Sequence, residues 1–194
     1  MFRVLLSHIM IEEKFISNGI SPSICDVPKN VLTVKYENCT VEYGKELTPT
    51  QVKDKPDVVY DGNSSSYYTL LMTDPDAPSR EDPKFGEVKH WLVMNIPGSD
   101  VSKGEEIAEY VGSGAPQGTG LHRYIFLLYK QPSKIDTDSE IKANRFTRNG
   151  RFNWNVKEFS KKYNLEGPIY GNFYQAQYDD YVPILHAQLS QESK

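Results

Sequence analysis

The sequence has few cysteines, no long hydrophobic run and no basic cluster, and each absence narrows what the protein can be. Only Cys25 and Cys39 occur among 194 residues, too few for a disulfide scaffold and without the Cys or His partners of a structural zinc site. A reducing, cytoplasmic location is therefore the simpler expectation, and secretion is less favoured. No stretch reaches the ~20 apolar residues of a membrane span. A net charge of −4 without clustered Lys and Arg disfavours general nucleic-acid binding.

The composition is that of a globular protein with a substantial core. Hydrophobic residues make up 38% of the chain, aromatic residues 12% and charged residues 25%. The length fits one domain over residues 1–194, in which residues 1–30 are an N-terminal extension. The opening MFRVLLSHIMIEEK is a poor signal peptide, because His8 interrupts its short apolar run and no small-residue cleavage site follows. No apolar heptad predicts an assembly, so we expect a monomer.

Short β-strand patterns dominate the chain. Runs rich in β-branched and aromatic residues are bounded by Gly, Pro, Asn and Asp clusters. We expect two strands within residues 31–44, then strands at residues 58–60, 67–73, 90–96, 123–130 and 172–178. Few helical patterns of crossover length separate them, which favours antiparallel pairing. Residues 67–72 and 124–129 are almost continuously apolar, as is typical of central strands buried on both faces.

Two helices are expected towards the C-terminus. In the first, Phe152, Val156, Phe159 and Tyr163 recur at helical spacing, and a Gly-Pro pair at residues 167–168 supplies a stop. Between the strands and this helix, residues 133–151 are polar and aperiodic and predict a long surface loop.

The second helix is expected in YVPILHAQL. Two aspartates at residues 179–180 can cap and charge its start, and Pro183 falls in its tolerant first turn. Tyr181, Leu185 and Leu189 share one face of this helix.

The stretch MTDPDAPSR, residues 72–80, concentrates two carboxylates behind an apolar strand. As an EF-hand loop it fails, because Ser79 takes the place of the glycine at the sixth position and Phe85 that of the glutamate at the twelfth. Pro75 and Pro78 fix two φ values and indicate a preset loop geometry. A solvent-exposed acidic turn is the alternative that the local sequence leaves open.

Two histidines, His90 and His122, each stand at the start of an expected strand. Together with Asp74 they could bind zinc, although their spacing does not require it. Imidazoles beside a carboxylate and backbone amides can instead receive a phosphate-like or carboxylate anion. The glycine-rich YVGSGAPQGTGLHRY, residues 110–124, could bring such amides close to an anion, but it lacks the P-loop ending and could equally be an irregular connection. No nucleophile motif predicts catalysis.

Four blocks of sequence closely resemble the phosphatidylethanolamine-binding protein family. They are TDPDAPSR, KHWLVMNIPG, EYVGSGAPQGTGLHRYIFLLYKQ and GNFYQAQYDDYVP, and the matching region runs from about residue 32 to residue 189. The family includes kinase-cascade inhibitors, flowering regulators and a carboxypeptidase inhibitor. The resemblance implies a mainly β fold, an antiparallel Greek-key β sandwich with a small C-terminal helical part.

The resemblance also implies a small anion pocket for phospholipid head groups, and a non-enzymatic protein without cofactor or metal. Carried over by motif, the ligand-binding residues are Asp74, Ala77, Pro78, His90, Gly114, Ala115, Pro116, His122, Tyr124, Tyr181 and Leu185. In this interpretation Asp74 orients a histidine, both histidines donate hydrogen bonds, and amides near Gly114 complete the cradle. A cis peptide is expected between Ala77 and Pro78, and Asp76 is expected to support the loop without touching ligand.

Partners follow from the same resemblance. The ligand is a phospholipid head group or another small anion, and the protein partner is a kinase or, as the alternative function, a serine-type protease or carboxypeptidase that the protein inhibits. Two departures bear on ligand choice. Val88 and Lys89 stand where many animal members have Trp and His, which predicts a less aromatic and more cationic rim, and Ala115 stands where a proline is common.

Overall fold

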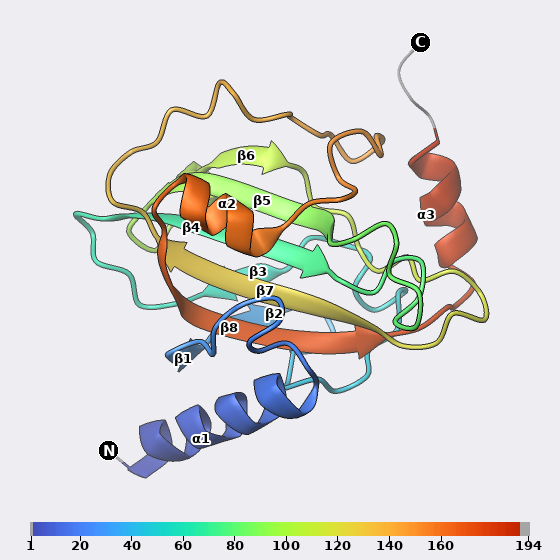
Figure 1. Cartoon of the computed structure of the whole chain (residues 1–194), viewed down its shortest axis with the longest axis horizontal. Helices are drawn as coiled ribbons and strands as arrows, with labels where there is room; N and C mark the ends of the chain where they lie inside the picture. Colours follow the sequence, from blue (N-terminus) through green and yellow to red (C-terminus); the bar gives the residue numbers. More distant parts are fainter. Residues whose placement is uncertain (1, 191–194) are drawn as a thin grey trace.

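The computed structural model describes residues 2–190, with side chains from residue 9 onwards (Figure 1). Three α-helices are present, α1 (Phe2–Ser17), α2 (Val156–Lys162) and α3 (Val182–Gln188), with the 3-10 helix η1 (Val101–Lys103). The strands are β1 (Asn30–Val31), β2 (Thr33–Lys35), β3 (Asp57–Val59), β4 (Tyr67–Asp74), β5 (Val88–Pro97), β6 (Glu105–Ala108), β7 (His122–Lys130) and β8 (Glu166–Ala176). The mainly β prediction is confirmed.

The main sheet has six strands in the order β1-β8-β7-β4-β5-β6. Its neighbours pair antiparallel except β1 and β8, which run parallel with Asn30 opposite Tyr170. The prediction of a wholly antiparallel sheet is therefore wrong at this edge. The chain returns from α1 along the outer side of β8, where Lys29 and Leu32 donate their amide hydrogens to the carbonyls of Pro168 and Gly171.

Both faces of the main sheet are buried, as the apolar central strands predict. Along β4, Leu70 and Met72 face one core and Leu71 faces the other, because successive strand side chains point to opposite faces. The small sheet of β2 and β3 covers the first face, whereas α2 and the end of α1 cover the second. In Figure 1, α2 crosses in front of the sheet and β2 and β3 lie behind it. The second layer of the expected sandwich is thus only two strands wide.

The chain segment at residues 31–44 forms one strand of the small sheet, not the two strands expected. β2 pairs with β3, and residues beyond it make only an isolated bridge between Lys35 and Thr40. The chain turns away because Tyr43 and Gly44 have positive φ values, and the Gly44 amide donates to the carbonyl of Phe173 in β8. The edge strand β6 was not predicted.

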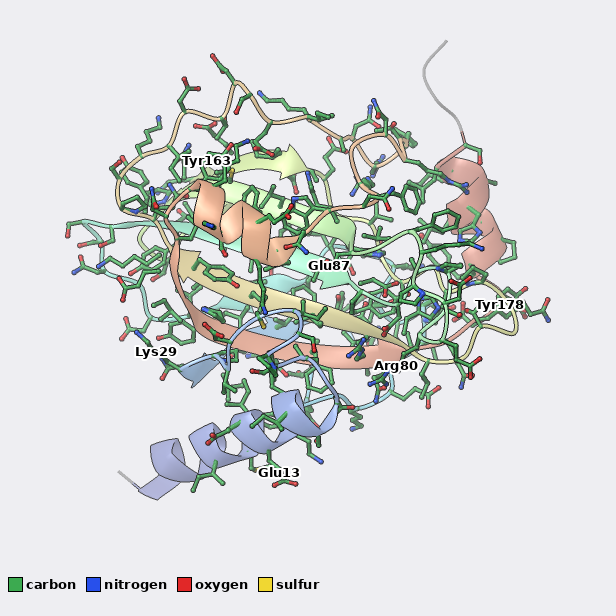
Figure 2. All side chains as sticks on the ribbon, in the orientation of Figure 1. Glu13, Lys29, Arg80, Glu87, Tyr163 and Tyr178 are labelled. Carbon is green, nitrogen blue, oxygen red and sulfur yellow. The ribbon has the colours of Figure 1, made fainter. Side chains whose placement is uncertain are left out.

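The helix α2 begins later than the apolar spacing suggests. Asn155 is its N-cap, and its side chain accepts a hydrogen bond from the Glu158 amide, so Phe152 lies before the helix. Glu87 accepts the Val156 amide and lies beneath the start of α2 (Figure 2). Burial raises the pKa of Glu87 to about 7. The Gly-Pro pair expected to stop the helix instead opens β8, which is longer than predicted.

The segment predicted as an N-terminal extension contributes to the core. Ile11 and Phe15, one turn apart on α1, are buried, and the Phe15 ring packs edge-on against Phe173 at 5.4 Å. The sequence analysis assigned no element here, although the i, i+4 spacing of these two residues was visible. Among the residues that the structure describes, no helix is both long and apolar enough to cross a bilayer.

One end of the main sheet gathers the motif residues. β4 ends at Asp74, β5 begins at Val88, and β7 begins at His122, which lies opposite Ala176 at the end of β8. The chain then turns into α3, which stands beyond this end of the sheet in Figure 1. Four blocks that are distant in sequence therefore meet at one place.

Candidate functional site

A cavity of about 210 Å³ opens at this end of the sheet. All but two of the eleven residues predicted to bind ligand line it, the exceptions being Ala115 and Tyr181. The methyl group of Ala115 is buried behind the lining, between Gly114 and Pro116. Tyr181 precedes α3 and lines a neighbouring groove instead. The structure thus brings the predicted residues together, while ligand binding by them remains a prediction.

Asp74 and His122 form a buried pair in the floor of the cavity. The Asp74 Oδ2 atom accepts a hydrogen bond from His122 Nδ1 at 2.9 Å, and its Oδ1 atom accepts the amide of Asp76 at 2.7 Å. Burial alone would lower the pKa of His122, but the hydrogen bond to Asp74 and the charges of Asp74 and Asp76 together raise it. His122 therefore holds its second proton more tightly than a solvent-exposed histidine.

Asp76 lies behind the cavity wall and does not line it. It is only 1% exposed and accepts three hydrogen bonds from Arg123, from the amide and Nε at 2.8 Å and from Nη2 at 2.5 Å. Arg123 also donates to the carbonyl of Asn18, which accepts a second hydrogen bond from Arg80 (Figure 2). The Ala77–Pro78 peptide is cis, as expected. The structure therefore places Asp76 in the supporting position expected of it.

His90 occupies the opposite side of the floor. Its Nδ1 atom lies 2.8 Å from the carbonyl oxygen of Val111, and its ring packs edge-on against Tyr124 at 5.2 Å. Burial lowers the pKa of His90, which outweighs the nearby charge of Asp74. The two histidines of the floor are thus biased towards opposite protonation states.

The loop that closes the mouth is fixed through Arg151. This side chain is 2% exposed, and it donates hydrogen bonds to the carbonyls of Lys89, His90, Glu109, Ala143, Asn144 and Thr147. Burial lowers its pKa to about 10. Arg151 thereby joins the polar loop predicted at residues 133–151 to the strand that carries His90.

The glycine-rich segment does not present the amide of Gly114 to the cavity, contrary to the predicted cradle. That amide donates to the hydroxyl of Tyr124 at 3.3 Å, and the Gly114 carbonyl accepts a hydrogen bond from His186 Nε2 at 2.8 Å. The neighbouring Ser113 hydroxyl pairs with that of Tyr174 at 2.6 Å. The loop is therefore held mainly by its own contacts to β7, β8 and α3.

Several residues of the mouth escaped the sequence analysis. They are Phe85, Val88, Val111, Gly112, Arg148, Phe152, His186 and Leu189. Phe85 and Phe152 are 45% and 43% exposed and touch at a ring separation of 6.1 Å. The departure at Val88 was noticed, and its neighbours one turn apart on α3 could have been found, since His186 and Leu189 flank Leu185. Nothing local in the sequence pointed to Arg148 or Phe152.

Lys89 does not make the rim more cationic, and this prediction is wrong. Val88 and His90 face the cavity, so Lys89 between them points to the opposite face of the sheet. There it is 3% exposed, with its ammonium group 5.2 Å from the centre of the Trp154 ring. Arg148 is the arginine that lines the cavity in its place.

A metal site at the two histidines has no support in the geometry. His122 Nδ1 is bound to Asp74 and His90 Nδ1 to a backbone carbonyl. Within the described part of the chain, no group of three or more His, Cys, Asp or Glu side chains is placed to hold a metal ion.

Comparison with known proteins identifies the fold around this cavity. The sequence model described as phosphatidylethanolamine-binding protein matches residues 25–175. The chain belongs to the phosphatidylethanolamine-binding protein family. The match contains all the motif residues of the floor, so the resemblance of the four sequence blocks is confirmed.

Similar members of this family are known from several sources. A Drosophila melanogaster protein named "Putative odorant-binding protein A5" is 41% identical over 168 residues, which cover 86% of this chain and 80% of that protein. The solved structure "CG7054 solution structure" is 49% identical with a TM-score of 0.71, covering 88% of this chain and 97% of its own. A carboxypeptidase Y inhibitor, solved in complex with its cognate proteinase, is 27% identical with a TM-score of 0.74, covering 89% and 97%.

Proposed function

We propose that this member of the phosphatidylethanolamine-binding protein family is a non-enzymatic binding protein whose cavity takes the polar head group of a phosphate-bearing lipid. The observation that carries the proposal is the contrast within one small cavity. Its floor holds the Asp74–His122 pair and His90, and its mouth holds the exposed rings of Phe85 and Phe152. A polar floor below an apolar lip suits an amphiphile.

The size of the cavity favours a head group over a whole lipid. A volume of about 210 Å³ falls below the ~300 Å³ at which pockets for drug-sized ligands begin. The acyl chains of a lipid would therefore remain outside, near the exposed phenylalanines.

Titration with soluble phosphoethanolamine tests this function. We expect saturable shifts of the His90 and His122 side-chain NMR signals, because both rings line the cavity. Tyr124→Phe should weaken binding several-fold, because its hydroxyl lies at the cavity. The matched control Tyr181→Phe removes a hydroxyl from outside the lining and should leave affinity unchanged. Absence of any saturable histidine shift would contradict the proposal.

Inhibition of a serine carboxypeptidase is the second function we propose to test. It is favoured by the similarity to the carboxypeptidase Y inhibitor, which spans most of both chains. The N-terminal half of α1, which extends past the body of the protein in Figure 1, is the segment predicted to engage the protease.

A truncation can separate this function from folding. Deletion of residues 1–9 spares Ile11 and Phe15, which anchor α1 in the core. The intact protein should inhibit and the shortened one should not. Equal inhibition by both proteins, or none by the intact protein, would exclude this role for the segment. Regulation of a kinase, a monomeric state and a cytoplasmic location stay predictions.

A further inference from the structure

The hydrogen bonds around His122 reveal which charge this side chain carries. Its Nδ1 atom donates to Asp74, and its Nε2 atom lies 3.0 Å from the hydroxyl of Thr119. The Thr119 hydroxyl donates to the carbonyl of Pro116 at 2.8 Å. Because a hydroxyl has one hydrogen, the proton shared with Nε2 belongs to His122. His122 is then an imidazolium whose two N–H groups are both engaged inside the protein.

His90 has the opposite character. A carbonyl oxygen only accepts hydrogen bonds, so the Nδ1 atom beside Val111 carries the hydrogen of this ring. Among the described residues no buried side-chain nitrogen or oxygen lacks a partner, and His90 Nε2 has none, so this atom is reachable from the cavity. With Asp74 and Arg151 as the nearest charges, burial keeps the pKa of His90 low and leaves Nε2 as an acceptor.

The floor therefore offers more acceptors than donors. The carboxylate of Asp74 and the Nε2 atom of His90 accept, whereas the hydroxyl of Tyr124 keeps one hydrogen to donate after accepting the Gly114 amide. A group that is itself rich in acceptors, such as phosphate, matches this floor poorly. A group with N–H or O–H hydrogens matches it well.

The mouth has the complementary chemistry. Arg148 lines the cavity in an exposed position and makes one long hydrogen bond, 3.5 Å, to the carbonyl of His186. A guanidinium carries five N–H donors in a fork that fits phosphate oxygens. Its loop is anchored three residues later by Arg151, so the guanidinium is presented from a fixed backbone.

We propose that the ligand binds with a primary ammonium group at the floor and its phosphate at the mouth, beside Arg148. This inference rests on the proposed head-group function and names the ligand class, a phosphate ester that carries a primary amine one short linker away. The order of groups from floor to lip is then amine, phosphate and apolar remainder, which places the remainder against Phe85 and Phe152.

Three probes and two variants of the full chain test the orientation. Isothermal titration at pH 7 and fixed ionic strength compares phosphoethanolamine, phosphocholine, which lacks N–H donors, and inorganic phosphate. We expect phosphoethanolamine to bind at least tenfold more tightly than either of the others. Arg148→Gln should weaken phosphoethanolamine binding about tenfold. Arg145→Gln is the matched control, because Arg145 lies on the same loop outside the lining and should have no effect.

The outcomes separate this inference from the function on which it rests. If inorganic phosphate binds as tightly as phosphoethanolamine and Arg148→Gln changes neither affinity, the anion sits at the floor and the orientation is wrong, while the head-group function stands. If phosphocholine binds as tightly as phosphoethanolamine, the ammonium hydrogens do no work and the orientation is also wrong. If none of the three probes binds, the proposed function itself fails.

Discussion

The floor of the cavity consists of buried side chains at strand ends, whereas its mouth consists of loop and helix side chains that stand partly in solvent. Asp74, His90 and His122 are fixed by the sheet register and by hydrogen bonds to one another's surroundings. Arg148 and Phe152 are fixed only through the backbone of their loop. The floor can therefore change little without loss of the fold, and the mouth can change ligand preference at small structural cost.

The largest expected effect is at the support of the floor. Asp76→Asn leaves the buried Arg123 guanidinium without its charge partner, and we expect a loss of about 3–5 kcal/mol in the free energy of unfolding. Urea unfolding measures it. Asp82→Asn, in the exposed part of the same loop, is the control and should leave stability unchanged. A small loss at Asp76 would mean that the floor is less dependent on this pair than its burial indicates.

A smaller loss is expected where the mouth is attached to the floor. Arg151→Met removes donors to several buried carbonyls, and we expect about 2–3 kcal/mol lower stability together with weaker head-group binding. Arg148→Met on the same loop should weaken binding with little change in unfolding free energy. Equal loss of stability in both variants would contradict the distinction between anchor and ligand contact.

Titration of the two floor histidines by NMR tests their opposite bias. We expect the midpoint of His122 above the ordinary value of 6.5 and that of His90 below it. Because the pKa of His122 is raised on folding, its stabilisation is fully present below the unfolded value and is lost as pH rises through the folded value. In Asp74→Asn the burial of His122 remains without its partner, so its midpoint should fall. Coinciding midpoints in the native protein would count against the charge assignment.

The smallest effect on folding is expected at the lip. Phe152→Ser should change stability by less than about 0.5 kcal/mol, because the ring is nearly half exposed. Affinity for a short-chain phospholipid should fall several-fold, while that for phosphoethanolamine should not. Phe146→Ser, an exposed phenylalanine of the same loop outside the lining, controls for general surface effects. An equal affinity loss in both variants would remove the lip from the binding site.

Much of the floor could be predicted from sequence, because its residues lie in local motifs at strand ends. Apolar runs located β4 and β7, and the block around Asp74 carried its own turn chemistry, visible as the Asp74 carboxylate accepting the Asp76 amide. The neighbourhood of His90 was predictable in position, but the side chosen by Lys89 was not, because strand alternation was not applied to it.

The mouth could not be predicted, because distant contacts determine its path. Arg148 and Phe152 reach the cavity only because Arg151 binds carbonyls more than 40 residues earlier in the chain. The spacing of Phe152 and Val156 suggested one helix, and the cap at Asn155 overrode it. Likewise, the parallel pairing of β1 with β8 joins residues about 140 apart, which no local pattern encodes.

The carbonyl of Asn18 bears on where the folded unit starts. Arg80 and Arg123 both donate to this single oxygen, one from the loop that forms the cavity wall and one from the strand behind it. The family match begins only at residue 25. A fragment cut to that boundary would leave two guanidinium groups without a shared acceptor, so the smallest autonomous version of this protein has to include the last turn of α1.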